Sequence, residues 1–254
     1  MVQHILKNRR LLRETFKLVG EAHKNEYRSR INSDGKRRSY DHHPMEVALL
    51  FAEMEVFSRR AKHRKLTSEQ VAKKIIEIAE RNAHMNKRQL KSRLLAVSRY
   101  MNNKQMTIIV GLLCHDAMEA DDKKATSQKE KNQAREKRIS EIKALRPGAE
   151  KIALRLTNSK RYKNKQQKRA HQVQLARNRQ YARLKMYDII ANMADQMLIP
   201  DEVRSLRKKL TLLKHMNKFM RVAYKDKNIP FCFYRASERI YENAKALQQM
   251  TLAA

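Results

Sequence analysis

The stretch of sequence that decides the fold is MTIIVGLLCHDAME, residues 106–119. Placed on a helix, its first nine residues are apolar on almost every side, which is typical of a helix buried in the middle of a bundle. His115 and Asp116 follow this apolar run directly. Burying an unpaired aspartate costs several kcal/mol, and a bound cation is one way to offset that cost. The stretch therefore predicts a helical core with a polar site at its end.

Apolar residues at helical spacing continue on both sides of this stretch. Thr67 and Gln70 have the spacing of a capping box, which predicts a helix start there. The 4 glycines, 4 prolines and absent tryptophan supply too few turn residues for a β-sandwich or β-barrel. Residues 121–138 are polar and predict either a loop or a solvated helix. We therefore expect an all-α bundle with helices over residues 3–23, from 44, from 67, 106–119, from 149, 172–195, from 201 and from about 236.

Charge is the second strong feature, because 58 Lys+Arg residues stand against 26 Asp+Glu residues in 254 residues, a net charge of +32. Such a field attracts polyanions, either nucleic acid through its phosphates or small polyphosphate substrates. Residues 123–185 hold 21 basic and 4 acidic residues, a net +17, and the run 160–169 holds no acid. Tyr162 and Tyr181 are the only aromatic residues within this basic region, so the sequence does not favour stacking on single-stranded bases there.

Composition also bears on the compartment. Two cysteines, Cys114 and Cys232, exclude a disulfide scaffold and favour a reducing compartment, which we expect to be the cytoplasm. No apolar run reaches the roughly 18 residues that a membrane-spanning helix needs. The basic N-terminus lacks the apolar core of a secretory signal.

Two further ionisable residues lie in apolar helical contexts, His43 within YDHHP (40–44) and Asp188 within LKMYD (184–188). Brought together with His115 and Asp116, they would give mixed nitrogen and oxygen ligation. Such a donor set suits Mn²⁺, Fe²⁺ or Zn²⁺ and leaves open positions for water. Taken singly, each of these residues is explained as well by a structural role, because a lone histidine on a helix is more often structural than a ligand.

Motifs around these residues resemble, in order, those of the HD-domain hydrolases of the RelA/SpoT type. This family includes the small alarmone hydrolases and the metazoan SpoT homologue. The similar segments are AH (22–23), YDHHPMEVA (40–48), LLCHDAME (112–119), LTN (156–158), KRAHQ (168–172) and LKMYDIIANMAD (184–195).

The resemblance implies a function and a site. The family removes the 3′-pyrophosphate of guanosine tetra- or pentaphosphate, the alarmones (p)ppGpp of the stringent response, and some members remove the 2′-phosphate of NADPH. It uses Mn²⁺ as its usual ion, with a glutamate that helps to activate the attacking water. Carried over by motif, the metal ligands are His43, His115, Asp116 and Asp188, the catalytic glutamate is Glu119, and the substrate pocket holds Arg28, Lys185 and Asn192.

Two departures from the family pattern matter. The family follows its glutamate with aspartate, whereas Ala120 stands here; either Asp121 supplies the missing carboxylate or the enzyme is slow or inactive. His43 and His115 are 72 residues apart, more than twice the family's usual spacing, so residues 58–100 are interpreted as a basic helical insertion. That insertion is a polyanion-binding arm or a solvated surface. We expect an HD-domain core over residues 1–200, and C-terminal helices over 201–254 that pack on the core, extend it or build a dimer face.

Two functional hypotheses follow. The first is a metal-dependent phosphohydrolase acting on an alarmone or on a related nucleotide such as NADPH. The second is a catalytically weakened HD fold that binds nucleic acid through its basic surface, and a structural metal site is a third interpretation. The four candidate ligands favour the first, since a binding module has no need of them. The net charge and Ala120 favour the second.

Overall fold

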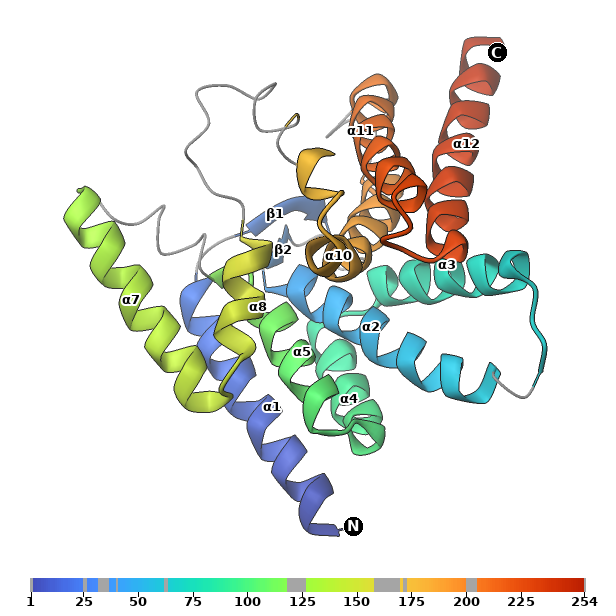
Figure 1. The fold of residues 1–254 in the computed structure, drawn as a ribbon. Coiled ribbons are helices and arrows are strands. Elements are labelled where there is room, and N and C mark those ends of the chain that lie inside the picture. Colours follow the sequence, from blue (N-terminus) through green and yellow to red (C-terminus); the bar gives the residue numbers. More distant parts are fainter. Residues whose placement is uncertain are drawn as a thin grey trace. The chain divides into compact units, whose positions relative to one another are not determined.

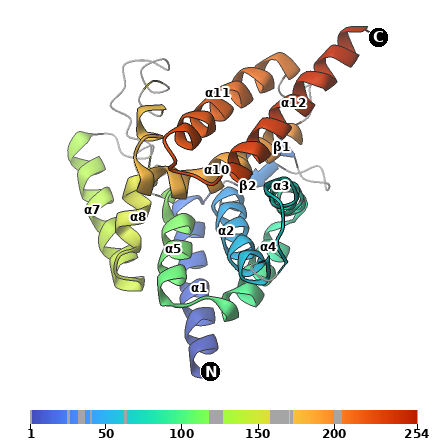
Figure 2. The same cartoon turned by 45° about the vertical axis from the view of Figure 1, so that its right-hand side comes forward.

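The computed structural model describes residues 2–24, 27–31, 37–39, 41–61, 64–117, 127–157, 170, 173–199 and 205–253. These residues are helical almost throughout (Figure 1 and Figure 2), which confirms the predicted all-α class. One short hairpin pairs strand β1 (Tyr27–Ile31) with β2 (Arg37–Ser39). Within the described residues, no helix combines the length and the apolar character needed to cross a membrane.

The helices follow the predicted order. They are α1 (Val2–Ala22), α2 (His42–Ala61), α3 (Ser68–His84), α4 (Lys87–Val97), the 3₁₀ turn η1 (Ser98–Tyr100), α5 (Asn103–Cys114), α7 (Gln128–Leu145), α8 (Ala149–Leu156), α10 (Arg179–Met197), α11 (Leu206–Lys225) and α12 (Phe231–Ala253).

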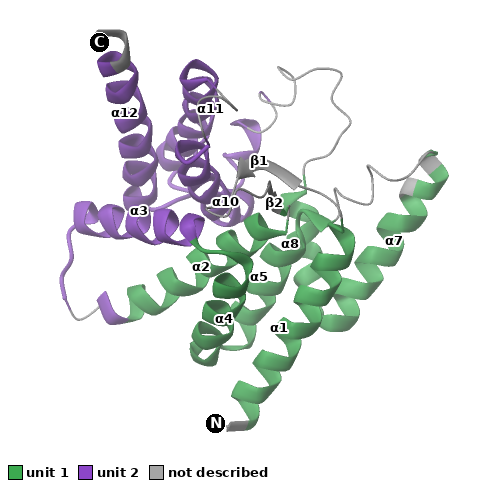
Figure 3. Ribbon diagram, turned by 180° about the vertical axis from the view of Figure 1, so that it is seen from behind, with its two compact units in different colours: residues 1–28, 38–59, 85–158 green, residues 29–37, 60–84, 159–254 purple. Residues whose placement is uncertain are grey.

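The chain forms two compact units, each built from three segments of sequence (Figure 3). Unit 1 comprises residues 1–28, 38–59 and 85–158, and unit 2 comprises residues 29–37, 60–84 and 159–254. Helices α1, α4, α5, α7, α8 and most of α2 belong to unit 1, and α3, α10, α11 and α12 belong to unit 2. The division at residue 200 drawn from the sequence stays a prediction.

Helix α5 is the core of unit 1, as its sequence predicts. Leu112, Leu113 and Cys114 have no exposed surface, and α5 packs against α1 and α8. Gly111 is required at the contact with α8, because a Cβ atom there would lie 2.6 Å from Cβ and Cγ2 of Ile152. The absent side chain lets the two helices approach closely.

Helices α1 and α4 also contribute to unit 1. The buried amide of Asn8 donates hydrogen bonds to the carbonyls of Ser98 (3.0 Å) and Met101 (3.2 Å), which fixes α1 against the end of η1. In α4, Leu90 and Leu94 are fully buried. The predicted insertion thus contains a helix that contributes to the core of its unit, in addition to basic surface.

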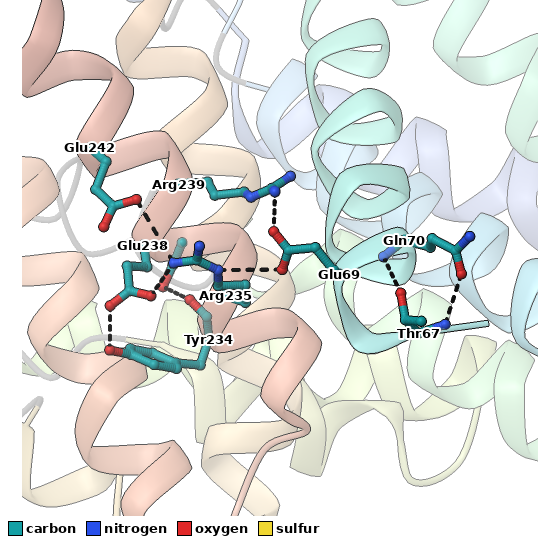
Figure 4. Close-up of polar contacts among 9 residues, drawn as sticks. Thr67, Glu69, Gln70, Tyr234, Arg235, Glu238, Arg239 and Glu242 are labelled. Atoms are coloured by element: carbon teal, nitrogen blue, oxygen red, sulfur yellow. Dashed lines mark hydrogen bonds and ion pairs between the residues drawn. The ribbon is translucent and has the colours of Figure 1, made fainter.

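Unit 2 is organised around α10 and α12. Helix α3 packs on both, and α11 packs on both as well. The rings of Tyr187 on α10 and Phe233 on α12 meet edge to face, with centroids 5.1 Å apart. At the start of α3, the Thr67 and Gln70 side chains cap each other's backbone amides (Figure 4), so the predicted capping box is confirmed. Glu69 then pairs with both Arg235 (3.3 Å) and Arg239 of α12.

Several helix boundaries differ from the sequence-based prediction: α5 spans Asn103–Cys114 instead of 106–119, and α10 begins at Arg179 instead of residue 172. Helix α12 begins at Phe231 rather than near residue 236. Pro230 directly precedes the helix, and its carbonyl accepts a hydrogen bond from the Phe233 amide, so the proline starts the helix. Within the polar segment 121–138, the described part from residue 128 is helical. It opens α7 with a capping box between Ser127 and Glu130.

Candidate metal centre

Helix α2 brings His43 into the interior of unit 1. Every residue from His42 to Met54 is buried, so the first turn of the helix carries its polar side chains into the core. His43 is 3% exposed. Its Nδ1 lies 3.7 Å from Oε2 of Glu46, which is also buried. A carboxylate beside a ligating imidazole orients the ring and raises its basicity, so Glu46 is suited to support His43.

The end of α5 positions His115, and a hydrogen bond fixes its tautomer. The His115 Nδ1 atom lies 2.6 Å from the carbonyl oxygen of Leu112. Because a carbonyl can only accept, Nδ1 carries the proton and the Nε2 lone pair is directed elsewhere. The Thr157 hydroxyl donates to the His115 carbonyl (3.0 Å), so the LTN segment noted in the sequence contacts this histidine.

His43 and His115 come together within unit 1, and Asp116 lies beside His115. The two imidazole rings lie edge to face with centroids 6.1 Å apart. His115 Nε2 is 3.1 Å from Oδ1 of Asp116. With the proton on Nδ1, both of these atoms present lone pairs, which repel at this distance. A bound cation between these two atoms would relieve that repulsion.

The spacing fits a metal ion. Nitrogen and oxygen ligands lie about 2.0–2.2 Å from a divalent transition metal, so two ligands at a right angle are about 3 Å apart. The observed 3.1 Å between His115 Nε2 and Asp116 Oδ1 agrees with that value. Two imidazoles and a carboxylate also form a donor set that suits Mn²⁺, Fe²⁺ or Zn²⁺.

Asp188 lies in unit 2, in the middle of α10, and is 4% exposed. Lys185, one turn earlier, places its ammonium nitrogen 2.5 Å from Oδ2 of Asp188. Asn192, one turn later, donates from its amide to Oδ1 (3.0 Å) and to the Asp188 carbonyl (2.9 Å). The structure thus brings three of the predicted residues together on one helix, where Lys185 and Asn192 both contact the Asp188 carboxylate.

The remaining predicted residues are Arg28 and those that follow Ala117. Arg28 lies in β1. Glu119, Ala120 and Asp121 lie outside the described residues, as does the basic run 160–169. The question of which carboxylate accompanies Glu119 therefore stays a prediction from the sequence.

One buried network beside His43 was missed at the level of sequence. The Asp41 carboxylate, 1% exposed, accepts a hydrogen bond from the Ser39 hydroxyl (2.6 Å) and pairs with the Lys87 ammonium (2.5 Å). Burial alone would raise the pKa of Asp41, but the hydrogen bonds from Lys87 and Ser39 and the charge of Lys87 outweigh it, so this pKa is lowered. His42 Nδ1 contacts the Ser39 hydroxyl (2.9 Å). The network anchors the first turn of α2, which carries His43.

Cys114 directly precedes His115 but has a different character. Its thiol is fully buried, and burial raises its pKa to about 12. The thiolate is both the nucleophile and the metal-binding form of cysteine, so Cys114 is suited to neither role. The chemistry at this end of α5 falls to the imidazole and the carboxylate that follow.

Comparison with known proteins gives no relative: no family model, no curated protein and no solved structure matches the chain.

Proposed function

We propose that this protein is a metal-dependent phosphohydrolase of the RelA/SpoT HD type, acting on a nucleotide that carries a 3′-pyrophosphate or a 2′-phosphate. The observation that carries the proposal is the pair of buried imidazoles, His43 and His115, with the partly exposed Asp116 carboxylate beside His115 in unit 1. The His115 tautomer and the 3.1 Å separation between its Nε2 and Oδ1 of Asp116 both suit a bound cation. The resemblance of the motifs supplies the reaction class.

The proposed ion is Mn²⁺, held by His43, His115, Asp116 and Asp188. His43, His115 and Asp188 are all buried, and each offers one ligand atom. When bound, the ion would supply Lewis-acid chemistry and lower the pKa of a coordinated water. Lys185 and Asn192 orient Asp188, and the hydrogen bond from His115 Nδ1 to the Leu112 carbonyl orients the imidazole ring. Glu119, with Asp121 as the candidate second carboxylate, is proposed as the general base for that water.

Charge and compartment agree with this proposal. A net charge of +32 concentrates polyphosphate ligands near the surface. Both cysteines are free thiols, so we place the activity in a reducing compartment, the cytoplasm.

The test is release of phosphate and pyrophosphate from guanosine tetraphosphate and from NADPH with added Mn²⁺. Pyrophosphate from the first substrate identifies a 3′-pyrophosphohydrolase, whereas phosphate from NADPH identifies a 2′-phosphatase. Mn²⁺ binding is measured in parallel by calorimetry on metal-free protein. We expect His115→Ala and Asp188→Ala to lose both Mn²⁺ binding and release.

The matched controls are His84→Ala and Asp226→Ala, which remove the same residue types from exposed positions of the chain. Both should keep wild-type Mn²⁺ binding and turnover. Full activity in His115→Ala or Asp188→Ala would overturn the ligand assignment. Intact Mn²⁺ binding without release from either substrate would overturn the proposed reaction.

A further inference from the structure

Helix α11 carries charge of a single sign. Its 20 residues include seven lysines and arginines and no acidic residue. Five of the cations, with Thr211, fall at intervals of three or four residues on one exposed face, which we call the α11 stripe: Arg207, Lys214, Lys218, Arg221 and Lys225. At a rise of 1.5 Å per residue, the α11 stripe is about 27 Å long.

Among the described residues, most cations of the α11 stripe have no ion-pair partner. In the part of the chain that the structure describes, no carboxylate lies within ion-pair distance of Lys214, Lys218 or Lys225. Arg221 differs, because it lies near Tyr234 and Glu238. A solvated helix face usually mixes charges of both signs, and a face of one sign points to a polyanionic partner.

Three aromatic rings lie at the C-terminal end of the α11 stripe. Tyr224 stacks on Tyr234 with ring centroids 5.1 Å apart and planes 2° from parallel, and Phe231 leans on both. Tyr224 is 37% exposed and Phe231 is 41% exposed. Tyr224 is three residues from Arg221 on α11, so the rings adjoin the α11 stripe. A nucleobase can extend such a stack, because every base has an aromatic face.

The exposed side chains of α11 argue against a membrane surface as its binding partner. Five of its apolar residues, among them Leu213 and Met220, are buried, and the helix packs on α10 and α12. Helices that lie in a bilayer interface need an exposed apolar face opposite their cationic one. Of the large apolar side chains on α11, only Tyr224 is exposed.

We propose that the α11 stripe and the ring cluster of Tyr224, Phe231 and Tyr234 form a binding surface for single-stranded nucleic acid. The cations contact successive phosphates, and the rings stack on a base at one end of the bound segment. This function is separate from hydrolysis, because none of these residues belongs to the proposed metal centre.

The test is fluorescence anisotropy of the full chain with single-stranded RNA and DNA oligonucleotides of about 15 nucleotides, titrated across a range of salt concentrations. The charge variant is Lys214→Gln/Lys218→Gln/Lys225→Gln. Each phosphate contact on a single strand contributes about −0.7 to the slope of log K against log salt. Loss of three contacts should therefore reduce the slope by about 2, with the melting temperature unchanged or higher.

The matched control is Lys129→Gln/Lys137→Gln/Lys143→Gln, which removes the same charge from exposed positions on α7. It should leave the salt slope close to wild type. An equal loss in both triple variants would show a diffuse polyelectrolyte effect and overturn the proposal, as would unchanged binding in the α11 variant.

The ring cluster is tested with Phe231→Leu, which keeps apolar volume and removes the aromatic face. Loss of a base stack predicts weakening by about fivefold or more. The control is Tyr100→Leu, since Tyr100 is similarly exposed, at 43%, in unit 1. Unchanged affinity in Phe231→Leu would overturn the stacking role.

Competing partners are tested in the same assay. Stronger binding to duplex, to polyglutamate or to anionic vesicles than to single strands would overturn the proposed partner. A preference between RNA and DNA would identify which single strand it is. Asp188→Ala should bind nucleic acid as well as wild type, so failure of the proposed hydrolase and failure of this surface can be told apart.

Discussion

Replacing Gly111 by alanine tests the packing that positions His115. Carbon atoms in contact usually lie about 3.5–4.0 Å apart, whereas the new Cβ would be 2.6 Å from two carbons of Ile152. One of them is the Ile152 Cβ itself, so no rotamer change can relieve the contact and α5 must move away from α8. Overpacking of this kind costs about 1–3 kcal/mol, toward the upper end here. The gain in helix propensity offsets about 1 kcal/mol.

We therefore expect Gly111→Ala to destabilise the metal-free protein by about 2 kcal/mol, which corresponds to roughly 4–8 °C in melting temperature. Circular dichroism during heating and in urea measures both. The control is Gly20→Ala on α1, where the nearest atom to the new Cβ is 3.9 Å away, so only the propensity gain applies. Mn²⁺ affinity should also fall in Gly111→Ala, since His115 is one turn further along α5. The reasoning is refuted if Gly111→Ala is as stable as Gly20→Ala.

Three further outcomes follow from the buried and paired groups. Cys114 should resist iodoacetamide at pH 8 in the folded protein, because burial raises its pKa to about 12, whereas the half-buried Cys232 should react slowly; peptide mapping distinguishes them. Lys87→Gln should destabilise the fold in urea by about 1–3 kcal/mol, because it leaves the buried Asp41 carboxylate without its cation while Lys87 itself is half-exposed. Burial acts to raise the pKa of Glu238, but hydrogen bonds from Tyr234 and Arg235 outweigh it and lower this pKa below 4.5. The ionised Glu238 thus stabilises the fold above pH 4.5 and this contribution is lost as the pH falls through the folded-state pKa, so the stability difference between wild type and Glu238→Gln should shrink in acid.

The helices could be predicted because their signals are local. The capping box at Thr67 and the apolar run before His115 each depend on residues within one or two turns. The predicted start of α12 was wrong by about five residues, because a proline can either end one helix or begin the next. Phe231 and Phe233 show a second limit. They are two residues apart, and only packing on α10 determines that Phe233 is buried and Phe231 exposed.

The candidate site depended on a different kind of information. Periodicity cannot join His43 to His115 across 72 residues, and the resemblance of motifs made that connection. The structure then brings their rings together in one unit. The cation beside Asp41 could not have been chosen from 58 lysines and arginines, because ion pairing across the fold follows from tertiary contacts.

The contrast between α7 and α11 separates charge that solvates the protein from charge that binds. Helix α7 has six basic residues but also three acidic ones, and Arg138 pairs with Glu141 one turn later (2.9 Å). Helix α11 has seven basic residues and no acid, and like charges three or four residues apart each destabilise a helix by about 0.2–0.5 kcal/mol. Three such pairs in the α11 stripe destabilise the helix by about 1 kcal/mol in all, and packing on α12 compensates for this cost. The charges therefore do not serve stability. Neutralising Lys214, Lys218 and Lys225 should raise the stability of the fold and weaken nucleic-acid binding. A face that only solvates the protein would not show the loss of binding.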